Sequence, residues 1–315
     1  MHAGKCGRAV RRETVGALSL AAAALTWGLV PAATRHVITV LSPTQILVLR
    51  FLLGGVAGIF LMLLLRVKMP PREHRPRALF WGVVGVLGFN VPLAYGIQRV
   101  DASVAAILTA TNPGFIVLLA AVTLKERVAP RVLIGMLVAL LGSVAVALAG
   151  ESGISLNRSQ LIGCGLLLVS TLLWSVFTVR IKPWLGVIPP ASVPVLGVWG
   201  SLPFVAPFGF NGLGGALRVL DGSEWLAVLT FGILASVIAP MLYAIGLTRG
   251  QASQAGLYLY LTPIFGVLVG AVLLGESLRP LTIVGGLLVL LGVALATLPP
   301  SLLQRIGLRR IAVAE

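Results

Sequence analysis

The chain of 315 residues contains few cysteines and few histidines, and each shortage excludes a kind of chemistry. Its two cysteines, Cys6 and Cys164, provide neither a disulfide framework nor a metal-ligand spacing. The three histidines, His2, His36 and His74, lie far apart and form no zinc-binding pattern. We therefore expect no metal site, no redox chemistry and no cofactor.

Charged residues are also scarce, at 10% of the sequence against about 25% in a soluble globular domain. Hydrophobic residues make up 58%, and the mean hydropathy is +1.03. Both values indicate an integral membrane protein. The formal net charge of +15 comes from short basic clusters between apolar runs, which is a pattern of membrane topology, so no nucleic-acid partner is expected.

Ten apolar runs are long enough to cross the bilayer, which requires about 20 helical residues. We predict an all-α integral membrane protein with ten transmembrane helices at approximately 15–34, 44–65, 78–98, 102–124, 131–149, 160–180, 191–210, 224–246, 251–274 and 281–298. The short connections leave no room for a soluble domain. The first run has basic residues ahead of it, as a signal peptide has, but it is long and another span follows at once, so we expect a retained helix.

Lysine and arginine residues are unequally divided between the two sides of this layout. With the N-terminus inside, eighteen fall on the cytoplasmic side and five on the outer side, namely Arg35, Arg99, Arg158, Arg218 and Arg279. This bias follows the positive-inside rule. We expect a multi-pass protein of the cytoplasmic membrane with both termini in the cytoplasm, the N-terminal tail at 1–14 and a basic C-terminal tail at 299–315.

The sequence repeats itself at an offset of 150 residues. Residues 94–148 align with 244–298 without a gap, and 21 of the 55 positions are identical, where chance would give roughly one in ten. The repeats are predicted at 15–149 and 160–298. Because each contains five helices, an odd number, the two copies must lie in the membrane upside-down relative to each other.

Each copy ends in the pattern P-x-F…L-x-E-x-x-x-P…G-x-L…L-L-G, and this pattern resembles the EamA-type members of the drug/metabolite transporter superfamily. The residues that carry the resemblance are Pro113 to Gly142, Pro263 to Gly292, Trp27, Trp174 and the Arg50-Phe51 pair. The resemblance covers about residues 15 to 298. It implies a secondary transporter for amino acids, sugars, drugs or other metabolites that works by alternating access, and it does not specify the cargo.

A proline lies in the middle of the fourth and ninth predicted helices, at Pro113 and Pro263. Each removes a hydrogen bond to the carbonyl four residues earlier, so the carbonyls of Thr109 and Leu259 are freed. Both prolines lie about 16 Å from the start of their helix, near the midplane. Irregular backbone at that depth is tolerated inside protein or beside a cavity. We expect these helix breaks to border the transport cavity; structural kinks are the alternative.

Polar and aromatic side chains share helix faces in helices 1, 3, 4, 6, 8 and 9, the set that the resemblance implies for the cavity lining. In the ninth helix Gln254, Tyr258 and Thr262 lie on one side, whereas the same face of the fourth helix is far less polar. Interhelical hydrogen bonds are the alternative role for each residue. The candidate substrate-binding residues are Trp27, Asn90, Tyr95, Asn112, Trp174, Tyr243, Gln254, Tyr258 and Thr262.

All nine acidic residues lie at helix ends, in connections or in tails. A buried carboxylate is the usual proton relay or cation ligand in a membrane, so cation efflux through an intramembrane glutamate is disfavoured. We expect export of a small neutral or zwitterionic metabolite, an amino acid or a similar solute. Another permease of the family, including a multidrug transporter, is the main alternative, and a channel or scaffold is less favoured. No span holds the paired groups that an intramembrane enzyme would need, so the protein is not expected to be an enzyme.

Arg50 is the only charged residue inside a predicted span, and two roles are open for it. It could pair with a carboxylate of the substrate. Alternatively, its long stem could reach the outer interface, or its guanidinium could cap carbonyls of a neighbouring helix, which would be a structural role. We favour the structural role.

Glu126 and Glu276 each precede by four residues a proline that starts the next helix. We expect each to cap that helix turn, with proton coupling as the alternative. Glycines recur in the fifth and tenth helices, as at Gly142 and Gly292. They predict close helix packing within the fold and could also serve a homodimer.

Overall fold

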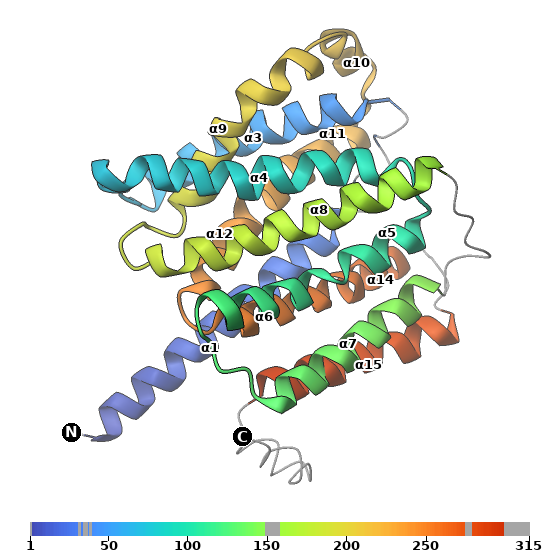
Figure 1. Cartoon of the computed structure of the whole chain (residues 1–315). Helices are drawn as coiled ribbons and strands as arrows, with labels where there is room; N and C mark the ends of the chain where they lie inside the picture. The colour runs from blue at the N-terminus through green and yellow to red at the C-terminus, as the bar shows by residue number, and fades with distance from the viewer. Residues whose placement is uncertain are drawn as a thin grey trace.

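The structure, a computed structural model, describes residues 2–30, 33, 37, 40–148, 158–274 and 279–298. The described residues form helices and turns, and no strand occurs among them. Figure 1 shows the long helices lying side by side, with α7 and α15 along one edge of the molecule and α9 and α10 along the other.

The helices follow the predicted order, and three of the central ones are divided. The first half contains α1 (His2–Gly28), α3 (Pro43–Leu64), η1 (Arg72–His74), α4 (Arg75–Ile97), α5 (Ala102–Thr109), α6 (Asn112–Thr123) and α7 (Pro130–Leu148). The second half contains α8 (Arg158–Ile181), η2 (Lys182–Trp184), α9 (Ser192–Gly209), α10 (Leu213–Val219), α11 (Gly222–Leu229), η3 (Thr230–Ile238), α12 (Ala239–Leu247), α13 (Ala252–Leu257), η4 (Tyr258–Tyr260), α14 (Leu261–Leu274) and α15 (Pro280–Thr297).

The predicted fold class is confirmed: the protein is an all-α integral membrane protein with ten transmembrane helices in two inverted five-helix repeats. Within the described residues, nine helical stretches are long and apolar enough to span a bilayer, beginning with α3. Helix α1 is not among these nine, and it contains the run predicted as the first span. Two details differ from the prediction. Helix α1 already begins at His2, inside the predicted tail, and α10 lies in a segment that we had treated as a connection.

Local sequence determines where some spans begin. Helix α3 starts at Pro43 behind Ser42, whose hydroxyl accepts the Gln45 N–H at 3.3 Å while the Gln45 side chain accepts the Ser42 N–H at 2.9 Å. This reciprocal capping box satisfies two donors that the first helical turn leaves unpaired. Asp221 and Glu224 form the same arrangement at the start of α11.

Helices α7 and α15, the fifth helix of each repeat, form the most extensive helix contact. A Cβ atom on Gly135 would lie 2.5 Å from the Gly292 carbonyl oxygen, and one on Gly142 would lie 2.6 Å from that of Gly285. The helices run antiparallel, since the residue number rises along one as it falls along the other. Gly135 and Gly285 are repeat counterparts, as are Gly142 and Gly292, so this glycine seam is symmetric and shows the inversion directly.

The other helices follow the same symmetry. Counterparts α3 and α9 face each other, and the fourth and ninth predicted helices meet through α6 and α13. The first helix of each repeat packs on the opposite repeat: α1 contacts α12 and α14, and α8 contacts α4 and α6. In Figure 1, α8 lies between α4 and α6. The centre of the molecule is therefore built from both repeats.

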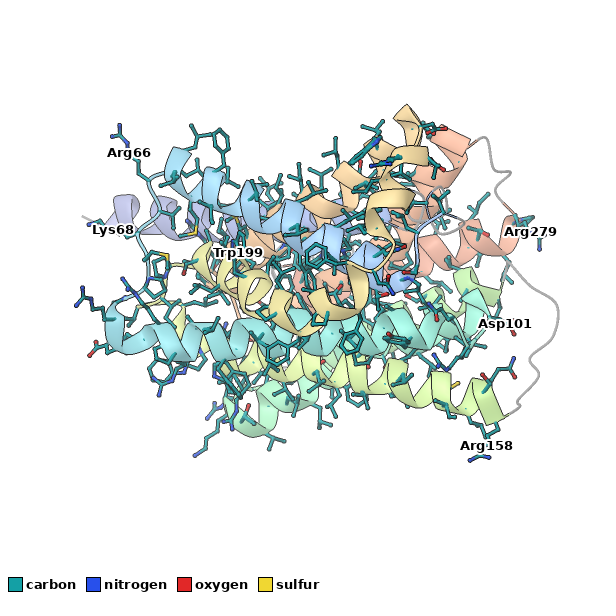
Figure 2. The ribbon with its side chains drawn as sticks, turned by 90° about the horizontal axis from the view of Figure 1, so that it is seen from above. Arg66, Lys68, Asp101, Arg158, Trp199 and Arg279 are labelled. Carbon is teal, nitrogen blue, oxygen red and sulfur yellow. The ribbon has the colours of Figure 1, made fainter. Side chains whose placement is uncertain are left out.

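The two ends of the molecule carry different residues (Figure 2). Arg66 and Lys68 lie at one end, whereas Asp101, Arg158 and Arg279 lie at the opposite end. We call them the Arg66 end and the Asp101 end. The Arg131 side chain donates to the Leu298 carbonyl at 2.9 Å, so the start of α7 and the end of α15 meet at the Arg66 end.

Candidate functional site

Three central helices are irregular just before a proline. The fourth predicted helix is divided into α5 and α6 at residues 110–111, directly before Pro113. The ninth is interrupted by the 3-10 turn η4 before Pro263, and the eighth adopts the π-helix η3 before Pro240. Proline has no N–H to donate, so each break leaves a backbone carbonyl in need of another donor.

The break in the eighth helix is completed by the first. In η3 the Ala239 N–H bonds the Leu234 carbonyl, five residues earlier. The next donor in this register would be Pro240, so the Ala235 carbonyl loses its helical partner. The Trp27 indole N–H donates to that carbonyl at 3.2 Å. The indole N–H of Trp27 is therefore used by a hydrogen bond within the fold, and only the ring surface of Trp27 is available to a cargo.

Five aromatic rings from both repeats meet around Trp174, and we call Trp27, Phe89, Trp174, Phe177 and Tyr243 the ring cluster. The Trp174 ring centroid lies 5.3 Å from those of Phe89 and Phe177, 5.5 Å from Trp27 and 5.6 Å from Tyr243. The rings are tilted or edge-on, which is the favourable arrangement for aromatic pairs. Three of the five were candidates from the sequence; Phe89 and Phe177 were missed.

Buried polar atoms accompany the ring cluster. The Tyr243 hydroxyl and the Thr178 hydroxyl make no hydrogen bond of good geometry in the described part of the chain, although the Tyr243 hydroxyl lies close to the polar atoms of Thr178 and Trp174. Asn90, which follows Phe89, donates its amide N–H to the Val86 carbonyl at 2.7 Å, but its Oδ1 atom has no partner there either. Buried polar groups are rarely left unpaired, because each costs about 1–3 kcal/mol.

Asn112 lies at the break of the fourth helix and contacts the sixth. The Ser175 Oγ atom is 3.0 Å from Asn112 Oδ1 and 3.3 Å from the Asn112 carbonyl oxygen. Ser175 directly follows Trp174 in α8. The break before Pro113 is thus held against the same helix that carries the centre of the ring cluster.

Arg50 of α3 reaches the irregular segment of the eighth helix. Its Nε atom donates to Ser236 Oγ at 3.3 Å, and Ser236 donates to the Phe231 carbonyl at 3.0 Å. Ser236 follows Ala235, so Arg50 and Trp27 attach to adjacent residues of η3. No further hydrogen bond or ion pair of Arg50 is found within the described residues.

The remaining candidates are dispersed. Tyr258 packs on the hydrophobic cluster that contains Trp174 and Tyr243, while Gln254 and Thr262, one turn before and one turn after it, are half-buried. Tyr95 is 37% exposed, and its described ring contact is with the Arg99 guanidinium at 5.9 Å, so it lies apart from the ring cluster.

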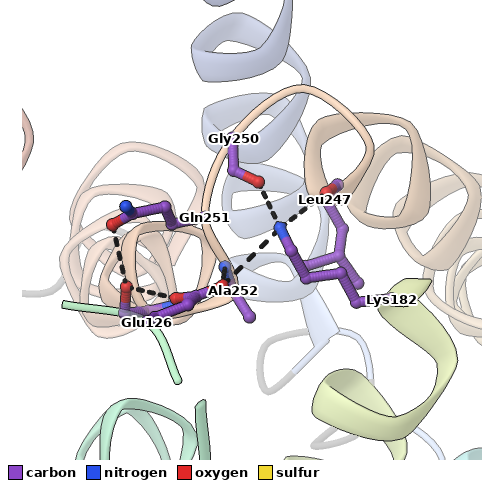
Figure 3. A network of polar contacts seen from close by, with 7 residues as sticks. Glu126, Lys182, Leu247, Gly250, Gln251 and Ala252 are labelled. Carbon is purple, nitrogen blue, oxygen red and sulfur yellow. Dashed lines mark hydrogen bonds and ion pairs between the residues drawn. The ribbon is translucent and has the colours of Figure 1, made fainter. Parts of the chain in front are cut away.

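A polar network joins the repeats at the Arg66 end (Figure 3), and we call it the clamp. The Glu126 carboxylate accepts the N–H groups of Ala252 at 2.8 Å and Ser253 at 3.0 Å, and the Ser253 hydroxyl at 2.7 Å. These N–H groups belong to the first turn of α13, where the N-cap residue Gln251 makes no side-chain cap. Glu126 thus caps α13 of the other repeat. Among the described residues, its carboxylate contacts α13 and Lys182 and not α7, the following helix, where we had expected the cap.

Lys182 completes the clamp. Its ammonium group lies 3.9 Å from Glu126 Oε1 and donates to the carbonyls of Leu247, at 3.4 Å, and Gly250. It therefore pairs with the carboxylate and also donates to carbonyls at and just after the end of α12, which have no N–H partner within the helix. Side-chain exposure is 9% for Glu126 and 20% for Lys182, so the pair is largely shielded from solvent. Glu276, the repeat counterpart of Glu126, lies outside the described residues.

Comparison with known proteins agrees with this architecture. Residues 14–148 and 161–298 each match the EamA-like transporter family. An uncharacterized transporter of Archaeoglobus fulgidus is 28% identical over 85% of this chain and 93% of its own length. A probable terminal-alkyne amino-acid exporter of Streptantibioticus cattleyicolor is 28% identical over 73% of this chain and 76% of its own. One solved crystal structure, 24% identical, superposes with a TM-score of 0.76 over 94% of this chain and 98% of its own.

Proposed function

Because the chain belongs to the EamA-like transporter family, we propose that it exports a small neutral or zwitterionic metabolite, such as an amino acid, by alternating access. The observation that carries this proposal is the ring cluster with its unpartnered polar atoms, at a place where no carboxylate is found among the described residues. The similar protein of Streptantibioticus cattleyicolor, a probable amino-acid exporter, supports the same cargo class.

The chemistry of the centre suits an amino acid. An ammonium group is attracted to the faces of tryptophan and tyrosine rings, and it can donate to Asn90 Oδ1, which lacks a donor. A carboxylate can accept from the Tyr243 and Thr178 hydroxyls. Arg50 could supply a charge-assisted contact to the same carboxylate, because its described hydrogen bond uses Nε alone. If Arg50 is instead structural, Arg50→Lys will lower the protein level and leave the apparent affinity unchanged.

In this proposal two layers, the ring cluster and the clamp, close the transport path toward the Arg66 end. Tyr243 precedes Leu247 by four residues and Trp174 precedes Lys182 by eight, so the ring cluster lies about 6–12 Å along the helices from the clamp. Both layers contain residues of both repeats. A movement of one repeat against the other would therefore open the clamp and separate the rings, which is the requirement for alternating access.

Counterflow in proteoliposomes tests this proposal. Vesicles loaded with one unlabelled amino acid should take up the labelled form of the same solute in a saturable manner. Transport of permanent organic cations alone would overturn the cargo class and favour a multidrug permease. Flux without saturation would indicate a channel, and the absence of flux for any solute would leave a scaffold.

We also propose that both termini are cytoplasmic, so the Arg66 end faces the cytoplasm. Eighteen basic residues on that side of the predicted topology support this orientation. Reporter proteins fused to each terminus should both be active in the cytoplasm. A reporter that is active outside the membrane at either terminus would contradict it.

A further inference from the structure

A pocket with a volume of about 310 Å³ opens at the Arg66 end, between the ends of α4, α6 and α8. Its polar and aromatic lining consists of Arg77 and Trp81 of α4, Thr123 of α6, and Arg180 and Trp184 of α8 and η2. None of its lining residues belongs to the ring cluster or to the residues proposed to bind cargo. Its chemistry therefore needs an explanation of its own.

Each of the two arginines of this pocket holds its guanidinium group over the ring of a pocket tryptophan, Arg77 closely and Arg180 at a longer distance. The Arg77 guanidinium carbon lies 3.6 Å from the centroid of the Trp184 ring, and that of Arg180 lies 5.9 Å from Trp81. Neither arginine has a hydrogen bond or an ion pair among the described residues. A contact with a ring face orients a guanidinium group without using its N–H donors. The N–H groups of both arginines therefore remain available to an anion.

The position of the pocket restricts the source of that anion. Trp81 lies about 9 Å along the helix from the start of α4, a depth at which tryptophans mark the level of the lipid headgroups. Deeper on α6 and α8, Leu118 and Leu172 are 60% and 41% exposed, and Phe80, next to Trp81 on α4, is 58% exposed, as expected for side chains that contact acyl chains. We therefore expect lipid to border the pocket on its membrane side.

We propose that this pocket binds the phosphate headgroup of an anionic phospholipid. Arginine forks match the oxygens of a phosphate, and basic pockets between transmembrane helices at the cytoplasmic surface suit anionic headgroups. The bound lipid would bridge α4 and α6 of the first repeat to α8 of the second. Because Lys182 lies between Arg180 and Trp184, the lipid would also stabilise the end of α8, next to the Lys182 side chain of the clamp.

Thermal unfolding of the full chain in a neutral detergent tests this site. Added phosphatidylglycerol should raise the Tm in a saturable manner, whereas phosphatidylcholine should have little effect. Inorganic phosphate and glycerol phosphate at millimolar concentration should also have little effect. A rise with these soluble anions equal to that with the lipid would overturn the lipid assignment and indicate a free-phosphate site.

Substitutions test whether the effect of phosphatidylglycerol on the Tm arises at this pocket. Replacing both pocket arginines, in Arg77→Gln with Arg180→Gln, should weaken the apparent affinity for phosphatidylglycerol at least about tenfold. The matched control, Arg66→Gln with Lys68→Gln, removes the same charge from the same end and should bind as the wild type does. Equal losses in both variants would mean non-specific attraction and overturn the site. Should the pocket variant not fold, Arg77→Lys keeps the charge but loses the fork and should also bind more weakly; unchanged binding would overturn the proposal.

Discussion

The glycine seam and the ring cluster both join the two repeats, but only the seam is symmetric. In the seam, each glycine meets the counterpart of the other: Gly135 faces Gly292 and Gly142 faces Gly285. In the ring cluster, Trp27 corresponds to another aromatic residue of the cluster, Phe177, 150 residues away. The positions 150 residues away from Phe89, Trp174 and Tyr243 are Ala239, Ala24 and Leu93.

The difference reflects two kinds of constraint. Backbones that approach closely tolerate only glycine, so both copies keep it. A cargo molecule has no twofold symmetry of its own, so the residues around it can diverge. The predictions below test this division between a symmetric frame and an asymmetric centre.

The largest effect is expected in the seam. In Gly285→Val, the Cβ would lie 2.7 Å from the Gly142 carbonyl oxygen and 2.9 Å from the Val146 backbone nitrogen, and neither backbone atom can move aside easily. We expect loss of folded protein in size-exclusion profiles, and the same loss for its counterpart Gly135→Val. Gly286→Val is the matched control, because open space surrounds that position. If Gly285→Val and Gly286→Val behave alike, the seam is not required.

A smaller loss of stability is expected at the clamp. Glu126→Ala leaves the first N–H groups of α13 and the Lys182 ammonium without their acceptor, at a cost of about 1.5–3 kcal/mol. The Tm of the purified protein should fall. Glu73→Ala removes a carboxylate that is 77% exposed at the same end and should leave the Tm unchanged. Equal Tm values for the two variants would refute a structural role of the clamp.

In the asymmetric centre, a substitution should change the affinity for cargo and leave the stability of the protein unchanged. Tyr243→Phe removes a hydroxyl that has no partner in the described structure, so its Tm should match or slightly exceed the wild-type value. If the hydroxyl binds cargo, the apparent affinity should fall by about fivefold to tenfold. Tyr95→Phe, at an exposed ring outside the ring cluster, should change neither quantity. A fall in Tm without a change in affinity would identify Tyr243 as a framework residue.

The smallest effect concerns the Trp27 hydrogen bond. Trp27→Phe should cost about 1 kcal/mol in the free energy of unfolding, because the Ala235 carbonyl loses a donor that the helix cannot replace. Trp199→Phe is the comparison: its indole donates to the Gly55 carbonyl at 3.1 Å, inside the regular helix α3. That carbonyl keeps its helical environment, so the second variant should cost less. The reverse order would contradict the role given to Pro240.

The spans, their order and their inversion could be predicted from the sequence because each depends on a local quantity. A span needs about 20 apolar residues, and the direction of each copy follows from the charges in the adjacent connections. The breaks before Pro113 and Pro263 also have a local cause, the missing N–H. Pro240 carries the same signal for the π-helix η3, but no helix break was predicted there.

The site was less predictable because its contacts join distant helices. Phe89 and Phe177 gave no signal, since an aromatic residue in an apolar helix resembles any lipid-facing side chain. Glu126 was assigned to the nearest helix in sequence, whereas its partners in α13 are more than 120 residues away. Tyr95 was chosen for its residue type, and its position near the end of α4 leaves it exposed. Cargo binding by the candidates stays a prediction.

The glycine seam also has a consequence for biosynthesis. Its two helices are separated by more than 130 residues, and α15 is the last described helix to be made. At about 5–20 residues per second, a ribosome takes roughly 7 to 26 seconds to make that intervening chain. During this time the glycine face of α7 has no partner and exposes backbone to lipid or to other helices. The nascent protein therefore depends on whatever covers this face until synthesis of the second repeat is finished.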